Sequence, residues 1–317
     1  MTQTDNINSR VADAMPDNWV YRWLPRVAWP YAQLARLDRP IGWQLLMWPC
    51  FWSAALAADV EAREGIYHAL TLTWHLALFF VGAVAMRGAG CTYNDLVDHE
   101  IDMAVARTRS RPLPSGRVTR FQAKMFILAQ ALVGLLVLLQ FNWFSVILGV
   151  ASLATVAVYP FAKRFTDWPQ FFLGLAFSWG ALMGWATAFG SLSAAAVVLY
   201  AAAIAWTIGY DTIYALQDKE DDALIGVRST ALLFGNHAKQ WISGLFGLTL
   251  GLLLIAFVLA GVPLIGYAGL AIAAVLFGYQ ILVLDMNDAA QCLALFKLNS
   301  KVGAIIFLGL MIAAPFA

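Results

Sequence analysis

Nine apolar stretches, each about long enough to cross a lipid bilayer, constrain this chain more than any other feature of its sequence. A membrane-spanning helix needs about 17–25 mostly apolar residues, because the backbone must satisfy its own hydrogen bonds inside the bilayer. The stretches lie at 41–58, 67–90, 122–141, 144–162, 170–190, 193–216, 239–261, 263–284 and 300–316. Alternating strands of about ten residues, typical of membrane barrels, are absent. The sequence therefore predicts an all-α polytopic membrane protein with nine transmembrane helices.

The composition supports this class and excludes several functions. Hydrophobic residues make up 61% of the 317 residues and charged residues only 12%, against about 25% charged residues in an average soluble domain. A formal net charge of +1 argues against nucleic acid as a partner. The three cysteines and four histidines are scattered without C-x-x-C or H-E-x-x-H spacing. Zinc, haem and iron–sulfur centres are therefore not expected.

The basic residues predict the orientation in the membrane. Of twenty Lys and Arg, eighteen fall on one side of a nine-span arrangement, Arg87 lies in the second span near that side, and only Arg63 lies opposite. The positive-inside rule places the basic side, with the N-terminus, in the cytoplasm. An odd number of spans then places the C-terminus on the far side. Since the first forty residues lack a secretory apolar core and are poor in basic residues for a transit peptide, we expect a bacterial inner membrane.

Two rows of acidic residues follow the second and sixth apolar stretches on the cytoplasmic side. At helical spacing, residues three or four positions apart share one face. The first row is Asn94, Asp95, Asp98 and Asp102, and the second row is Asp211, Tyr214, Asp218 and Asp222. Carboxylates in or near a span are costly and usually functional. The alternative, that these are solvated helix ends, fits Glu100, Glu220 and Asp221 better, because those residues point off the shared faces.

The carboxylate rows predict a site for divalent cations. Like charges at i, i+4 repel one another unless a cation lies between them. Oxygen ligands without His or Cys suit Mg²⁺ or Mn²⁺, and Mg²⁺ usually completes its shell with water and phosphate. The predicted metal ligands are Asn94, Asp95, Asp98, Asp102, Asp218 and Asp222. A coarse repeat, in which each half has a span, an acidic row and a basic loop, suggests one shared site with two ions.

Basic residues beside the rows offer partners for a diphosphate. Arginine binds phosphate bidentately. The candidates are Arg107, Arg109, Arg111, Lys163, Arg164 and Arg228. The alternative for each is a role in membrane topology alone. Lys163 and Arg164 are favoured, because Tyr159-Pro160 is expected to end a span just before them.

These motifs resemble the UbiA superfamily of intramembrane prenyltransferases over residues 36–317. That family carries N-D-x-x-D-x-x-x-D after its second helix and D-x-x-x-D after its sixth, and both patterns are present here without departures. Four further segments look like its 4-hydroxybenzoate polyprenyltransferases of ubiquinone synthesis. They are Arg36-Leu37-Asp38-Arg39-Pro40-Ile41-Gly42, Arg111-Pro112-Leu113-Pro114-Ser115-Gly116, Tyr159-Pro160-Phe161-x-Lys163-Arg164 and Asp211-Thr212-x-Tyr214-Ala215-x-x-Asp218.

The resemblance implies the organisation, the reaction and the substrates. A cytoplasmic segment 1–35 precedes a single domain 36–317, in which nine helices surround a central cavity open to lipid. The reaction is Mg²⁺-dependent transfer of a polyprenyl group from its diphosphate to the ring carbon ortho to the hydroxyl of 4-hydroxybenzoate. The implied catalytic carboxylates are Asp95, Asp98, Asp102, Asp211, Asp218 and Asp222. The implied substrate-binding residues are Asn94, Arg39, Arg87, Arg107, Arg109, Arg111, Tyr159, Lys163, Arg164, Tyr214 and Arg228.

Several roles stay open at this point. Either Arg39 or Arg87 is expected to pair with the acceptor carboxylate, because a carboxylate in an apolar cavity needs a cation. Asp95 or Asp211 is a candidate to accept the phenol hydrogen, or else supports the metal ligands. The alternatives for the whole chain are another acceptor of the superfamily, such as a naphthoate, homogentisate or haem, and an ion-coupled transporter. A transporter would place its carboxylates near the bilayer midplane.

Overall fold

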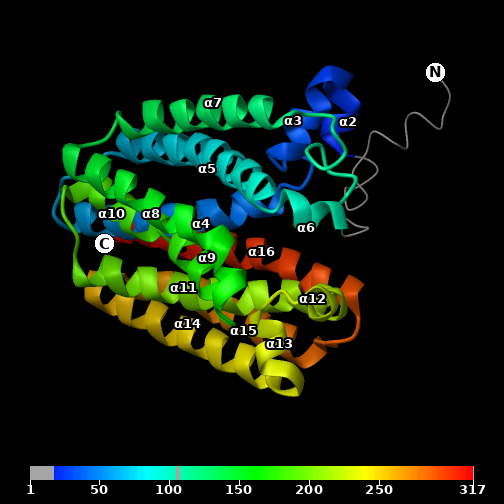
Figure 1. Ribbon diagram of the computed structural model, residues 1–317. Coiled ribbons are helices and arrows are strands. Elements are labelled where there is room, and N and C mark those ends of the chain that lie inside the picture. The colour runs from blue at the N-terminus through cyan, green and yellow to red at the C-terminus, as the bar shows by residue number, and fades with distance from the viewer. Residues whose placement is uncertain (1–17, 105–107, 317) are drawn as a thin grey trace. The chain divides into compact units, whose positions relative to one another are not determined.

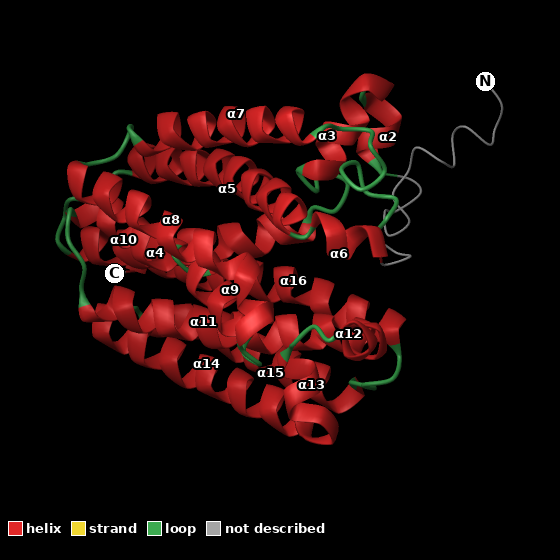
Figure 2. Cartoon of the chain, in the orientation of Figure 1, coloured by secondary structure: helices red, strands yellow, loops and turns green. Residues whose placement is uncertain are grey.

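The computed structural model describes residues 18–104 and 108–316, and this part of the chain is helical, with no strand (Figure 2). The chain divides into two compact units. The first unit is Met1–Gln44 with Phe80–Leu139, and the second is Leu45–Phe79 with Gln140–Ala317. Two long helices, α4 (Ile41–Arg63) and α5 (Ala69–Val97), contribute residues to both units.

The remaining helices can be followed along the chain in Figure 1. In the first unit they are α2 (Trp19–Trp23), η1 (Arg26–Ala28), α3 (Trp29–Leu34), α6 (His99–Ala104) and α7 (Arg120–Leu138). The second unit begins with α8 (Trp143–Phe165), α9 (Pro169–Phe177), α10 (Gly180–Phe189), α11 (Ala194–Ala215), η2 (Leu216–Asp218) and α12 (Lys219–Ile225). It ends with α13 (Thr230–Phe234), η3 (Gly235–His237), α14 (Ala238–Ala260), η4 (Leu264–Gly266), α15 (Tyr267–Val283), α16 (Ala289–Ala313) and η5 (Ala314–Phe316).

Eight helical segments within the described residues are long and apolar enough to cross a membrane, which confirms a polytopic α-helical membrane protein. They are Ala69–Val97, Arg120–Leu138, Trp143–Phe165, Pro169–Phe189, Ala194–Asp218, Thr230–Ala260, Leu264–Val283 and Ala289–Phe316. The ninth predicted span, 41–58, coincides with α4, which has the length but is less apolar because of residues such as Gln44 and Pro49. Residues 52–59 of α4 are all buried. Other parts of the protein surround this part of the helix, so it can tolerate polar groups.

Short polar caps fix the starts of α8 and α11. Asn142 accepts a hydrogen bond from the Ser145 backbone N–H and donates one, 2.7 Å long, to the Ala186 carbonyl. This amide therefore begins α8 and ties its start to the end of α10. Ser193 caps α11 through the Ala196 N–H. These caps satisfy backbone groups that a helix end leaves unpaired, which explains how such short loops connect the spans.

One predicted helix end is wrong. The Tyr159-Pro160 pair does not end α8, which continues through Pro160 to Phe165. A proline inside a helix loses one backbone hydrogen bond, and transmembrane helices tolerate this loss because neighbouring groups compensate.

Small residues allow a close helix contact between α15 and α16 in the second unit. A Cβ added at Gly269 of α15 would lie 2.8 Å from the Ile305 carbonyl oxygen and 2.9 Å from the Gly309 Cα of α16. The two backbones thus approach as closely as glycine allows, which is the usual way that membrane helices pack without a hydrophobic driving force. By contrast, a Cβ at Gly278, on the same helix, would meet nothing within 4 Å.

We therefore expect Gly269→Ala to destabilise the protein and Gly278→Ala to leave it unchanged or slightly more stable. The first change forces two backbones apart, at a cost of about 1–3 kcal/mol, whereas the second adds a better helix former in open space. The thermal midpoint of each detergent-solubilised variant is the measurement. Equal midpoints for the two variants would contradict this packing.

Candidate active site

The first acidic row lies at the C-terminal end of α5, where the helix bends and continues as α6. α5 runs past the predicted span end to Val97, and a bend at Asp98 precedes α6. The helical hydrogen bonds persist through the bend, because the Asp98 N–H donates to the Asn94 carbonyl at 2.9 Å and the Asp102 N–H to the Asp98 carbonyl at 2.8 Å. The i, i+4 register predicted from the sequence is therefore present in the structure. The carboxylates of the row are buried: Asp95 is 0%, Asp98 2% and Asp102 5% exposed.

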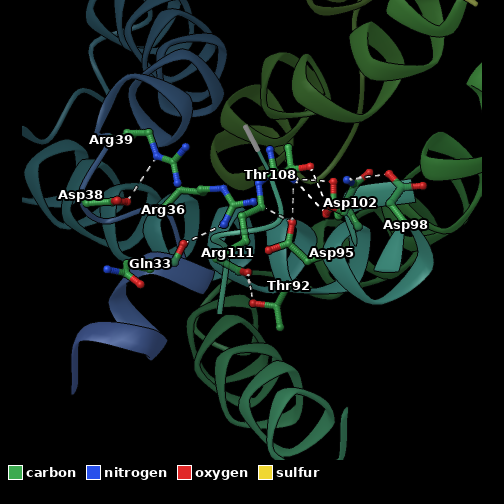
Figure 3. Close-up of polar contacts among 12 residues, drawn as sticks. Gln33, Arg36, Asp38, Arg39, Thr92, Asp95, Asp98, Asp102, Thr108 and Arg111 are labelled. Carbon is green, nitrogen blue, oxygen red and sulfur yellow. Dashed lines mark hydrogen bonds and ion pairs between the residues drawn. The ribbon is translucent and has the colours of Figure 1, made fainter. Parts of the chain in front are cut away.

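Two arginines compensate the buried charge of this row (Figure 3). Arg36 donates from Nη2 to Asp95 Oδ1 at 2.6 Å. Nη1 of Arg111 lies 3.0 Å from both oxygens of Asp102 and 3.5 Å from Asp95 Oδ1. Arg111 thus binds two carboxylates of the row, whereas the sequence predicted that it would bind diphosphate. Asn94 donates from Nδ2 to Asp98 Oδ2 at 3.0 Å, so it contacts one of its predicted fellow ligands.

The row carries more negative charge than its environment favours. Burial raises the pKa of the Asp102 carboxyl, and the Arg111 guanidinium only partly opposes this, while Asp95 and Asp98 raise the pKa further. A raised carboxyl pKa means that the ionised form is destabilised in the folded protein. A cation bound among these carboxylates would remove that penalty.

The residues of the row fit a hard divalent cation such as Mg²⁺. Asp95 Oδ2 is buried and has no hydrogen-bond partner among the described residues, so this oxygen is a candidate ligand. Its neighbours in the row are oxygen donors, which Mg²⁺ prefers. Within the described residues no group of three or more His, Cys, Asp or Glu already stands in position to hold a metal. Both oxygens of Asp102 and Oδ1 of Asp95 face arginines, whereas Oδ2 of Asp95 does not.

The remaining basic candidates of the first unit differ in their surroundings. Arg39 lies 3.4 Å from Asp38, and Arg109 is exposed, while Arg107 lies outside the described residues. Arg87 packs beside Gly42 of α4, where an added Cβ would lie 2.5 Å from Arg87 Nε. The absence of a side chain at Gly42 is therefore what leaves room for the Arg87 guanidinium.

The second acidic row lies in the second unit, where α11 ends and η2 leads into α12. Asp211, Tyr214 and Asp218 are partly buried, and the Tyr214 ring packs on Phe296 of α16 with centroids 4.6 Å apart. The side chain of Asp222 lies outside the described part of the structure. Lys219 ties this segment to the loop before α16, donating to Asn287 Oδ1 at 2.6 Å.

The predicted basic residues of the second unit meet where α8 ends. The Arg228 N–H donates to the Lys163 carbonyl at 3.3 Å. The Arg228 side chain is exposed and lies 3.8 Å from Asp167. The Arg164 guanidinium lies over the Phe161 ring, 5.4 Å from its centroid. Tyr159 is half-buried, one turn earlier on α8. The backbone thus brings Lys163 and Arg228 together, although their side-chain roles stay predictions.

Sequence reasoning assigned no site role to Arg36, to Gln33 or to Arg117. Gln33 is fully buried and accepts a 2.8 Å hydrogen bond from Arg117 Nη1 at its Oε1. In the sequence, Arg36 stood out only as the first residue of the 36–42 motif. Its contact with Asp95 joins residues 59 positions apart, which no local pattern predicts.

The chain matches a known protein family and named relatives. Residues 46–301 match the UbiA prenyltransferase family. The chain is 47% identical over 300 residues to a mitochondrial 4-hydroxybenzoate polyprenyltransferase of Arabidopsis thaliana, covering 94% of this chain and 72% of that protein. A protein of the same name from Drosophila melanogaster is 49% identical over 290 residues, covering 91% and 72%.

Solved structures share the fold at lower identity. A UbiA homolog from Aeropyrum pernix K1 in its apo form superimposes with a TM-score of 0.70 at 23% identity, covering 85% of this chain and 97% of that one. A UbiA homolog from Archaeoglobus fulgidus, bound to GPP and Mg²⁺, gives a TM-score of 0.65 at 17% identity and covers 90% and 99%. With the family match over most of its length and these relatives, the chain belongs to the UbiA prenyltransferase family.

Proposed function

We propose that this protein transfers a polyprenyl group from polyprenyl diphosphate to the ring carbon ortho to the hydroxyl of 4-hydroxybenzoate. The observation that carries the proposal is the 47–49% identity, over more than nine-tenths of the chain, to proteins named for this activity. The buried first row supports a dependence on Mg²⁺, and GPP and Mg²⁺ are bound together in the Archaeoglobus relative. The product would serve ubiquinone synthesis.

The acidic rows and basic residues would hold the diphosphate. Asn94, Asp95, Asp98 and Asp102 in the first row, and Asp218 and Asp222 in the second, are the proposed metal ligands, with one Mg²⁺ for each row. A bound Mg²⁺ supplies electrophilic stabilisation of the charge that develops on a leaving diphosphate. The proposed partners of the phosphate oxygens are Arg107, Arg109, Arg111, Lys163, Arg164 and Arg228, and the guanidinium of Arg is well shaped for this task.

The acceptor needs a cation of its own. A benzoate carboxylate that leaves water requires a paired positive charge. The two candidates are Arg87, which is half-buried beside Gly42, and Arg39, which lies beside Asp38. Tyr159 and Tyr214 are proposed to contact substrate. Asp211 or Asp95 would accept the phenol hydrogen as the ring carbon attacks the allylic carbon, and apolar side chains would keep water from that carbon.

The cellular setting is proposed from charge. The protein is a multi-pass membrane protein, and its basic residues support a cytoplasmic N-terminus in a bacterial inner membrane. The relatives above are named as mitochondrial proteins, and that location describes them. We also propose that residues 36–317 form the catalytic domain and that residues 1–35 are a cytoplasmic segment before it.

One assay tests the function directly. Membranes containing the protein are incubated with labelled acceptor, polyprenyl diphosphates of several lengths, and Mg²⁺ or a chelator. We expect prenylated 4-hydroxybenzoate with Mg²⁺ and none with the chelator. Prenylation of a naphthoate or homogentisate in its place would select another acceptor of the family, and product formation in metal-free membranes would contradict the metal site.

The carboxylate rows give a second prediction. Asp98→Ala and Asp218→Ala should each lose nearly all activity while remaining folded, because each removes a ligand of a metal that stabilises the leaving group. If both rows serve one diphosphate, the double variant should be hardly worse than either single variant, since residues that act as a unit are non-additive. If the fold-loss of activity in the double variant equals the product of the two single fold-losses, the rows act independently.

The position of Arg87 gives a third prediction. Gly42→Ala should displace the Arg87 guanidinium and lower kcat/KM for the acceptor, as Arg87→Ala should also do. Gly90→Ala is the matched control, because a Cβ at Gly90 would meet nothing within 4 Å. Steady-state kinetics with 4-hydroxybenzoate as the varied substrate measure all three variants, and an unchanged kcat/KM in Arg87→Ala would remove this residue from the acceptor site.

The order of bond breaking and bond making gives a fourth prediction. If the diphosphate leaves before the ring attacks, a fluorine near the reacting carbon withdraws electrons from the developing cation. Turnover of the fluorinated donor should then fall by orders of magnitude while its binding stays nearly unchanged. A donor that turns over at the normal rate would favour direct displacement by an activated phenol.

A further inference from the structure

The backbone of Arg36 adopts a conformation that arginine rarely takes. Its φ is +55°, and it is the only non-glycine residue with positive φ within the described part of the chain. It follows α3, whose end is closed by two hydrogen bonds: the Arg36 N–H donates to the Gln33 carbonyl at 3.2 Å and the Leu37 N–H to the Ala32 carbonyl at 2.9 Å. Helices that end in this way usually carry glycine at this position. Arginine therefore stands here against local backbone preference, which often marks a functional residue.

The side chain of Arg36 links this helix end to the acidic row. Nη1 donates to the Gln33 carbonyl at 2.7 Å, and Nη2 donates to Asp95 Oδ1 at 2.6 Å. The guanidinium is 11% exposed and the carboxylate fully buried. One planar group thus holds both the end of α3 and the first aspartate of the row (Figure 3).

The two carboxylate oxygens of Asp95 differ in their hydrogen bonding. Oδ1 accepts from Arg36 and lies 3.5 Å from Arg111, whereas Oδ2 is buried and has no hydrogen-bond partner in the part of the chain that the structure describes. The carboxylate is therefore held in one orientation by Oδ1 and presents Oδ2 to a ligand. A partner that fixes a metal ligand in this way typically changes metal affinity by about 10–100-fold when it is removed.

The N-terminal helices hold the loop that carries Arg36. Trp19 Nε1 donates to the Leu37 carbonyl at 3.2 Å, and the Asn18 side chain donates to the Asp38 carbonyl. Gln33 donates to the Tyr21 hydroxyl at 3.1 Å. Residues that precede the first span thus brace the position of the guanidinium.

We propose that Arg36 is a positioning residue for divalent-cation binding by the first acidic row. It fixes Asp95 through Oδ1 so that Oδ2 is presented to the cation. The proposal rests on the proposed function in that the row binds Mg²⁺, and it adds a residue outside the acidic motifs to that site.

The test compares three variants of the full-length protein, purified in detergent. Arg36→Gly relieves the backbone conformation and removes the guanidinium. Arg36→Lys keeps the charge, but a single ammonium cannot reproduce the planar fork. Arg22→Gln is the matched control, because Arg22 is an exposed arginine of the same N-terminal segment. The dissociation constant for Mn²⁺, used as a Mg²⁺ substitute, is measured from the electron paramagnetic resonance signal of free Mn²⁺, and thermal midpoints are measured in chelator.

We expect Mn²⁺ binding to weaken by about 10–100-fold in both Arg36 variants and to stay unchanged in Arg22→Gln. In chelator, Arg36→Gly should have a lower midpoint than the wild type, because Asp95 loses its buried partner. If Arg36 only ends a helix, glycine would instead maintain or raise the midpoint and leave Mn²⁺ affinity unchanged. Tighter Mn²⁺ binding in Arg36→Gly would show that Arg36 competes with the metal, and would also overturn the proposal.

The lysine variant keeps the test decisive if Arg36→Gly does not fold, since it retains the charge. Wild-type affinity in Arg36→Lys would then reject the positioning role. Failure of the proposed function looks different, because in that case the wild-type protein itself would neither bind Mn²⁺ nor form the prenylated product.

Discussion

The first unit depends on the pairing of buried carboxylates with buried arginines. An ionised carboxylate removed from water costs several kcal/mol unless partners compensate it, and Asp95, Asp98 and Asp102 are all nearly inaccessible. Arg36 and Arg111 supply two positive charges to the row. This compensation remains incomplete, as the raised pKa of Asp102 indicates. A divalent cation bound at this row would therefore stabilise the buried carboxylates.

The surrounding helices make such a row possible. If these carboxylates were exposed to water, salt would screen their charges, and their interactions with the arginines would be weak. Here α5 carries the row, the end of α3 supplies Arg36, and the segment before α7 supplies Arg111. In the same unit, the lack of a side chain at Gly42 leaves room for the guanidinium of Arg87. The same helix ends therefore determine both how the helices of this unit pack and where its charged side chains lie.

The sequence predicted the spans and the acidic register because both follow from local periodicity. Apolar stretches located the helices, and i, i+4 spacing located Asp98 and Asp102 on one face even across the bend. The partners of those carboxylates could not be predicted in this way. Arg36 contacts Asp95 across 59 residues from a left-handed conformation, and Arg111 binds carboxylates where a phosphate role was expected. The continuation of α8 through Pro160 was also not predicted, because a local pattern does not show that a membrane helix can tolerate the lost backbone hydrogen bond.

The central claim is that the first acidic row binds a divalent cation that holds the donor diphosphate. Anomalous diffraction from crystals grown with Mn²⁺ and a non-hydrolysable prenyl diphosphate analogue tests it most directly. We expect an anomalous peak within coordination distance of Asp95 Oδ2 and of a diphosphate oxygen. A diphosphate bound with no peak at this row, or a peak remote from Asp95, would contradict it.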